Sequence, residues 1–129
     1  ETAATLSGPR AMAMAGVKHR EIDVVELYDS FTITVIVTLE SLGFCGKGNG
    51  GMFVLDGRTA PGGELPVNTN GGGISYAHPG MYGIFPLIEA TRQLRDECGK
   101  RQVKDAAIAL VHGTGGVLSS CVTCVLSNS

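Results

Sequence analysis

Hydrophobic positions along the chain follow two different spacings. Helical spacing covers residues 2–16 and 84–98, and each segment ends at a glycine, Gly16 or Gly99, the residue that most often closes a helix. Pro9 fits the first helix only if that helix starts near Ser7, with the proline in its first turn. Short apolar runs without helical spacing predict buried strands, and they lie at residues 22–27, 106–111 and 117–126.

Residues 31–42 give two conflicting signals. Their threonine, isoleucine and valine content favours a strand, whereas apolar side chains starting with Phe31 fall on one helical face. Asp29 or Ser30 would cap a helix here, and Gly43 would end it. We interpret the segment as a helix.

The segment 43–73 is rich in glycine and proline, and loops of this length in a compact domain are usually functional. A short strand at 52–55 is one option within it. The element order is then helix, strand, helix, long loop, helix and two strands. Alternation of strands and helices predicts one α/β layered domain, and the last two strands form an antiparallel hairpin that turns at 113–116.

Composition excludes several classes of function. The formal net charge is −2, whereas nucleic-acid-binding surfaces are basic. The most apolar stretch, 31–39, is shorter than a membrane span and contains three threonines. The four cysteines follow no framework, which indicates reduced thiols in a cytoplasmic protein. Cys121 and Cys124 are no metal pair, because strand residues three apart point to opposite faces.

Glycines surround the first candidate for chemistry, His78. We expect this histidine beside the start of the helix 84–98, where the N-terminal field disfavours the imidazolium and leaves a neutral ring able to exchange a proton. Upstream glycines, among them Gly72 and Gly73, would let a substrate approach the backbone. The alternative is a polar residue that caps a turn.

Two further polar groups follow predicted strands. Tyr28 and Asp29 come directly after the strand 22–27, and ligands gather at the carboxyl ends of strands in α/β sheets. A tyrosine can donate a proton or stabilise an oxyanion, and an aspartate can orient or accept a proton. His112 opens a His-Gly-Thr-Gly-Gly turn that ends in Gly115 and Gly116. We expect His78, Tyr28 with Asp29, and His112 to converge on one rim of the sheet. The alternatives are that Asp29 caps a helix while Tyr28 packs, and that His112 is a hydrogen-bonded histidine in a hairpin turn.

These motifs, in this order, resemble the thiolase superfamily, especially the lipid-transfer-protein-like thiolases of the sterol-carrier-protein branch. The match rests on I-D-V-V-E-L, L-G-F-C-G-K-G, N-T-N-G-G-G and His-Pro-Gly. The resemblance implies a mixed five-stranded sheet flanked by helices and ending in a β-hairpin. It also implies that residues 1–129 form the C-terminal domain. The N-terminal half, which carries the nucleophilic cysteine in the family, would be absent, together with the first strand of this half. The isolated domain should then be inactive.

The resemblance also suggests roles for the candidate residues. His78 matches the histidine of the family's Gly-His-Pro loop, although Ala77 replaces the glycine. Tyr28-Asp29-Ser30-Phe31 stands where the family has Asn-Glu-Ala-Phe, and His112 stands where a second catalytic cysteine is usual. Tyr28 and Tyr82 look more like the residues of thiolase-fold aldolases that cleave steroid side chains. They would be base and proton relay there, with His78 as the enolate stabiliser and Tyr76 as a third candidate.

By resemblance, the expected function is that of a thiolase-like acyltransferase that makes or breaks a C–C bond next to a CoA thioester. A retro-aldol lyase acting on a 3-hydroxyacyl-CoA is the first alternative, and a non-catalytic acyl-CoA- or lipid-binding lobe is the second. The resemblance implies no covalently bound cofactor and no metal, with coenzyme A entering as the substrate thioester. It also implies a homodimer and a small partner protein that bears an OB fold. Gly72, Gly73, Gly115 and Gly116 would approach the CoA thioester.

Overall fold

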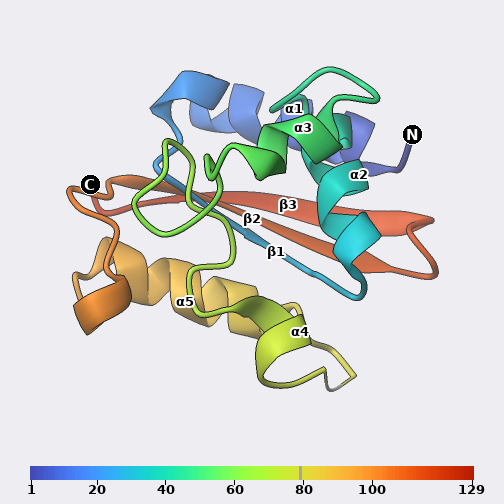
Figure 1. Ribbon diagram of the computed structural model, residues 1–129. Coiled ribbons are helices and arrows are strands. Elements are labelled where there is room, and N and C mark those ends of the chain that lie inside the picture. Colours follow the sequence, from blue (N-terminus) through green and yellow to red (C-terminus); the bar gives the residue numbers. More distant parts are fainter. Residues whose placement is uncertain (79) are drawn as a thin grey trace.

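The computed structural model describes residues 1–78 and 80–129. A sheet lies between two helical layers, with α1, α2 and α3 on one face and α4 and α5 on the other (Figure 1). The helices are α1 (Ala4–Ala15), α2 (Thr32–Leu42), α3 (Gly50–Leu55), α4 (Gly72–Ser75) and α5 (Ile84–Leu94), with 3₁₀ turns at His19–Glu21 and Gly99–Arg101. The strands are β1 (Val24–Leu27), β2 (Ile108–Gly115) and β3 (Ser120–Ser127).

The sheet has three strands in the order β1-β2-β3, with β1 parallel to β2 and β3 antiparallel to it. The expectation of five strands is therefore wrong for the described part of the chain. A single parallel bridge, Val25 to Val67, continues the sheet beyond β1. It cannot lengthen into a strand, because Pro66 has no N–H and Asn68 has left-handed backbone at φ 51°.

Side chains alternate across the sheet and fill two cores. Val25, Leu27 and Leu110 pack against α1 and α2, where Leu39 and Leu42 are buried. On the opposite face Val24, Ala109 and Val111 pack against Ala90 of α5. By the same alternation Glu26 faces α5, whereas His112, two residues after Leu110, faces α1 and α2.

Most predicted elements are present with shifted ends. Residues 31–42 are confirmed as helical, and Gly43 ends α2 in the left-handed conformation, as Gly16 ends α1. α1 starts at Ala4 rather than near Ser7, since the Thr2 hydroxyl accepts the N–H of Ala4 and stabilises an earlier first turn. The strand suggested at 52–55 is wrong, because these residues belong to α3.

At the other end of the chain two boundaries also differ. α5 stops at Leu94 rather than Cys98, with Asp96 in left-handed backbone beyond it. β2 continues to Gly115, through most of the turn expected at 113–116, and the chain reverses over 116–119 instead. Cys121 and Cys124 lie in β3 on opposite faces: the Cys121 thiol is 3.2 Å from Ser7 Oγ, and Cys124 packs in the α5-side core. Among the described residues, no helix has the length and apolar character needed to cross a membrane.

Candidate active site

The carboxyl end of β1 positions Tyr28 and Asp29. Asp29 is buried, and its two carboxylate oxygens accept the N–H groups of Gly73 at 2.8 Å and Ile74 at 3.2 Å. Asp29 therefore caps α4, and the expectation that it caps α2 is wrong, because α2 begins after Phe31 with no side-chain cap. This contact joins the end of β1 to α4, more than 40 residues further along the chain.

Gly72 and Gly73 make room for that carboxylate. A Cβ atom on Gly72 would collide with Asp29 Oδ2, and one on Gly73 would lie 3.0 Å from Asp29 Oδ1 and 3.2 Å from the Tyr82 ring. Only glycine fits at Gly72, where φ is also +70°. The close approach that these glycines permit is thus made by Asp29 within the chain. Their contact with a CoA thioester stays a prediction.

Tyr28, His78 and Tyr82 form an aromatic cluster beside Asp29. The Tyr28 ring lies edge-on to Tyr82 at 5.3 Å between centroids and edge-on to His78 at 5.5 Å. Tyr82 is buried and stacks on Phe85 at 5.5 Å, whereas His78 is exposed. Of the three groups expected to converge on one rim of the sheet, the structure brings Tyr28 and His78 together. The expectation is wrong for His112, whose ring is buried against Thr123.

His78 is not placed at a helix N-terminus. α4 ends at Ser75 and α5 begins at Ile84, so His78 lies in the connection between them. The expected influence of the α5 N-terminus on His78 is therefore wrong, since that effect falls off within the first turn of a helix. Pro79, the second residue of the His-Pro-Gly motif, lies outside the described residues.

A hydrogen-bonded chain leads from Tyr82 to the surface. The Tyr82 hydroxyl is 3.3 Å from the Tyr76 hydroxyl, which accepts a hydrogen bond from Asn70 Nδ2 at 3.1 Å. Burial, and then the contact with Tyr76, raises the pKa of Tyr82 well above its ordinary range. Tyr82 therefore stays a neutral phenol, and the partly exposed Tyr76 is its contact with the surroundings.

His112 points away from this cluster. Its Nδ1 lies 2.8 Å from Thr123 Oγ1, which lies 2.7 Å from the Ser7 hydroxyl of α1. The ring is fully buried and its Nε2 has no partner in the described structure. Burial lowers the pKa of His112 to about 4, so the ring is neutral at pH 7. Only its backbone carbonyl reaches the cluster residues, as it accepts the N–H of Tyr28 at 2.9 Å.

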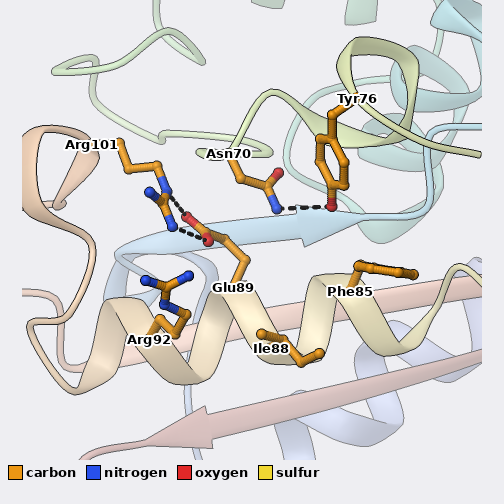
Figure 2. A pocket seen from close by; sticks show the side chains of 7 residues that line it. All are labelled: Asn70, Tyr76, Phe85, Ile88, Glu89, Arg92 and Arg101. Carbon is orange, nitrogen blue, oxygen red and sulfur yellow. Dashed lines mark hydrogen bonds and ion pairs between the residues drawn. The ribbon is translucent and has the colours of Figure 1, made fainter.

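Two hollows flank the aromatic cluster. An open groove of about 560 Å³ runs from Tyr28 and Met81 to Gly115 and Cys121 at the end of the hairpin. Gly116 follows in the turn itself. A second pocket of about 350 Å³ opens over α5, where Tyr76 and Phe85 supply aromatic walls and Arg92 and Arg101 supply charge (Figure 2).

Beneath the second pocket lies a buried polar network that the sequence did not reveal. Arg101 forms two hydrogen bonds with Glu89, from Nε at 2.8 Å and from Nη2 at 3.0 Å (Figure 2). Thr69, Glu26 and Gln93 complete the network. One signal was available: Glu26 interrupts an otherwise apolar strand, and a carboxylate at such a position must find partners. No group of metal-binding residues is present in the described ranges.

The chain is similar to proteins of the thiolase C-terminal domain family. The family described as thiolase C-terminal domain-like matches residues 1–128. An acetyl-CoA acetyltransferase of Methanothermobacter thermautotrophicus is 44% identical over 115 residues, which are 88% of this chain and 30% of that protein. Sterol carrier protein 2 of Bos taurus is 41% identical over 107 residues, or 82% of this chain and 20% of the bovine protein.

A solved structure titled Ltp2-ChsH2(DUF35) aldolase superposes with a TM-score of 0.85. It is 34% identical, and the match covers 97% of this chain and 32% of the aldolase chain. The chain thus spans less than a third of the length of each of these three proteins. Because the family model covers nearly every residue, the chain belongs to the thiolase C-terminal domain family.

Proposed function

We propose that this domain forms one side of an active site that cleaves a C–C bond next to a CoA thioester by retro-aldol chemistry. The observation that carries the proposal is the contact of Tyr28 with both Tyr82 and His78 at the end of β1. The site therefore presents phenol and imidazole groups together. The similarity to an aldolase of the same fold supports the same chemistry.

The reaction fits these groups as follows. A base removes the proton from the 3-hydroxyl, C3 becomes the carbonyl of the released aldehyde or ketone, and the C2–C3 bond breaks. The electron pair of that bond passes to C2 and the thioester oxygen and forms an enolate. Protonation of the enolate at C2 then gives the shortened acyl-CoA. Tyr28 is the candidate base and His78 the candidate donor to the enolate oxygen. Tyr82 is the candidate proton relay, and because it is buried its exchange with the surroundings runs through Tyr76.

Acyl transfer to free CoA is the second candidate. The similarity to an acetyl-CoA acetyltransferase favours it. In that reaction His78 would activate a cysteine supplied outside these residues, and a second acid/base would handle the α-carbon proton. His112 is the sequence-based candidate for that second group. Its burial on the opposite face of the sheet counts against this role, and this is why retro-aldol cleavage ranks first.

We further propose that the complete protein acts as a homodimer with a separate partner protein of the DUF35 type. The aldolase of similar structure is named as an assembly with such a partner. Exposed apolar side chains around the candidate site are consistent with a covered rim, among them Phe31 at 70% and Met81 at 91% relative exposure. Co-purification of the complete protein with the product of a neighbouring gene would support the partner.

The deciding experiment supplies the complete protein with a 3-hydroxyacyl-CoA and no free CoA. Release of an aldehyde or ketone with a shortened acyl-CoA supports retro-aldol cleavage, and Tyr28→Phe should strongly slow that release. If only a 3-ketoacyl-CoA is cleaved, and only with added CoA, the protein is an acyltransferase and the proposal is wrong. If acyl-CoA binds but neither substrate turns over, the domain is a binding lobe.

A further inference from the structure

The buried network under α5 contains one hydroxyl between two carboxyl groups. Thr69 Oγ1 lies 2.7 Å from Glu26 Oε1, 2.8 Å from Glu89 Oε1 and 2.9 Å from Gln93 Nε2. Glu26 and Glu89 are both almost completely buried, so neither can turn to solvent for a partner. The arrangement of hydrogen atoms among these four groups can be worked out from the contacts.

The Gln93 side chain fixes one of the three contacts. Val103 donates its N–H to Gln93 Oε1 at 2.8 Å, so the amide nitrogen is the atom that faces Thr69. An amide nitrogen only donates, and it therefore occupies one lone pair of the Thr69 hydroxyl. The single hydroxyl hydrogen of Thr69 remains for one of the two carboxyl groups.

Glu89 is the group that receives this hydrogen. Burial alone would raise the pKa of Glu89, but its two contacts with Arg101 and the bond from Thr69 outweigh burial and lower it. Glu89 is therefore the anion, and Thr69 donates to it. The remaining contact, Glu26 to Thr69, has a hydrogen atom only if Glu26 is protonated and donates.

The surroundings of Glu26 favour the protonated form. Its burial, with the nearby negative charges of Glu89 and Asp29, raises the pKa of Glu26 from 4.5 to about 8, although its contacts with Thr69 act in the opposite direction. The other ionisable groups of this region are Tyr82, Arg101 and Cys98, and burial raises the pKa of Cys98 to about 11. Arg101 is the one cation among them, and Glu89 already engages it.

Thr69 belongs to the loop that builds the candidate active site. Its backbone N–H also donates to Glu26 Oε1, at 3.1 Å, and the preceding Asn68 accepts the N–H of Leu27 through Oδ1 at 2.7 Å. The same loop continues into Gly73, which binds Asp29, and into Tyr76, which meets Tyr82. The Glu26–Thr69 contact thus holds this loop to β1 on the way to the site.

We propose that Glu26 is a positioning residue that keeps its proton at neutral pH and, by donating it to Thr69, holds the loop 68–76 against the end of β1. This inference rests on the proposed function for its effect on turnover, but not for its effect on the loop. When Glu26 ionises, two carboxylates compete for one hydroxyl hydrogen and repel each other. The loop then loses a contact, and Asp29, Tyr76 and Tyr82 lose their fixed places.

The test is hydrogen–deuterium exchange of residues 68–76 in the complete protein between pH 6 and pH 9, with protection corrected for the intrinsic pH dependence of exchange. In the unaltered protein, protection should fall as the pH rises through about 8. Glu26→Gln, whose amide still donates to Thr69, should remove that fall. Thr69→Val should reduce protection on the order of tenfold at every pH because it leaves buried groups unpaired. Thr69→Ser should restore it, and Glu97→Gln, at an exposed glutamate, should match the unaltered protein.

Turnover is the second readout, with the substrate that the deciding experiment identifies. Thr69→Val should lower kcat on the order of tenfold to a hundredfold with a smaller change in KM, since misplaced groups mainly affect the reacting geometry. Unchanged protection in Thr69→Val, or the same pH midpoint in Glu26→Gln, would overturn the proposal. If the unaltered protein shows no turnover at all, that result counts against the proposed function. The hydrogen–deuterium exchange result still decides the role of Glu26.

Discussion

Replacement of Glu26 by glutamine should change how the stability of the protein depends on pH. The pKa of Glu26 is 4.5 in the unfolded chain and about 8 in the folded one. Between these values the folded state holds a proton that the unfolded state has released, so the free energy of unfolding falls as the pH rises. The slope is about 1.4 kcal/mol per pH unit, and the whole interval gives about 5 kcal/mol as an upper limit.

Glutamine at position 26 removes this pH dependence of the unfolding free energy. It lowers that free energy by a smaller amount, which is the same at every pH. Its amide can donate to Thr69 Oγ1 but cannot also accept the Thr69 N–H, which lies 3.1 Å from Glu26 Oε1. The loss of one such hydrogen bond costs about 1 kcal/mol. Glu26→Gln should therefore be slightly less stable than the unaltered protein below pH 5 and more stable above pH 7. The two stability curves should cross between about pH 5 and pH 6.

Urea unfolding at several pH values measures both curves. All other titrating groups are shared by the two proteins, so the difference between their unfolding free energies isolates Glu26. Parallel curves from pH 5 to pH 9 would refute the reasoning, because Glu26 would then be ionised in the folded protein.

Three further predictions follow from the same geometry. Tyr28→Phe should lower kcat by about 10² to 10⁴, the usual contribution of a general base, while circular dichroism stays unchanged. Gly73→Ala should lower the melting temperature, since overpacking against Asp29 and Tyr82 costs about 1–3 kcal/mol. Gly51→Ala, where a Cβ meets nothing within 4 Å, is the control. Arg101→Met should cost several kcal/mol in denaturant unfolding, because it leaves Glu89 buried without its cation, and the double change Arg101→Met with Glu89→Met should cost less.

Local patterns were sufficient to predict the elements that bury one apolar face. The helix at 32–42 formed despite its β-branched content, because its apolar spacing and the closing glycine outweighed that content. The hairpin turn was placed too early because glycines usually mark such turns. In the structure, Val117 and Leu118 take the two central positions with positive φ, where Asn-Gly is preferred.

Only part of the candidate site could be predicted, because motifs reveal some neighbours and not the contacts between residues far apart in the sequence. Tyr28 and Tyr82 could be associated through motifs, and the structure brings them together. The side of the sheet that His112 faces follows from the pairing of β2 with β1, and the apolar run 106–111 left that side open because both of its faces are covered. The Glu26 network depends on contacts between residues far apart in sequence, which no local spacing encodes.

The alternation of side chains across the sheet separates the molecule into two parts that can be altered independently. The α5 face carries Glu26, Glu89 and the tyrosines, so substitutions there change charge and chemistry together. The α1 and α2 face is packed mainly with apolar side chains, and the buried His112 on this face is neutral at pH 7. A library that seeks greater stability without altered reactivity should therefore vary the α1 and α2 face and leave the α5 face unchanged.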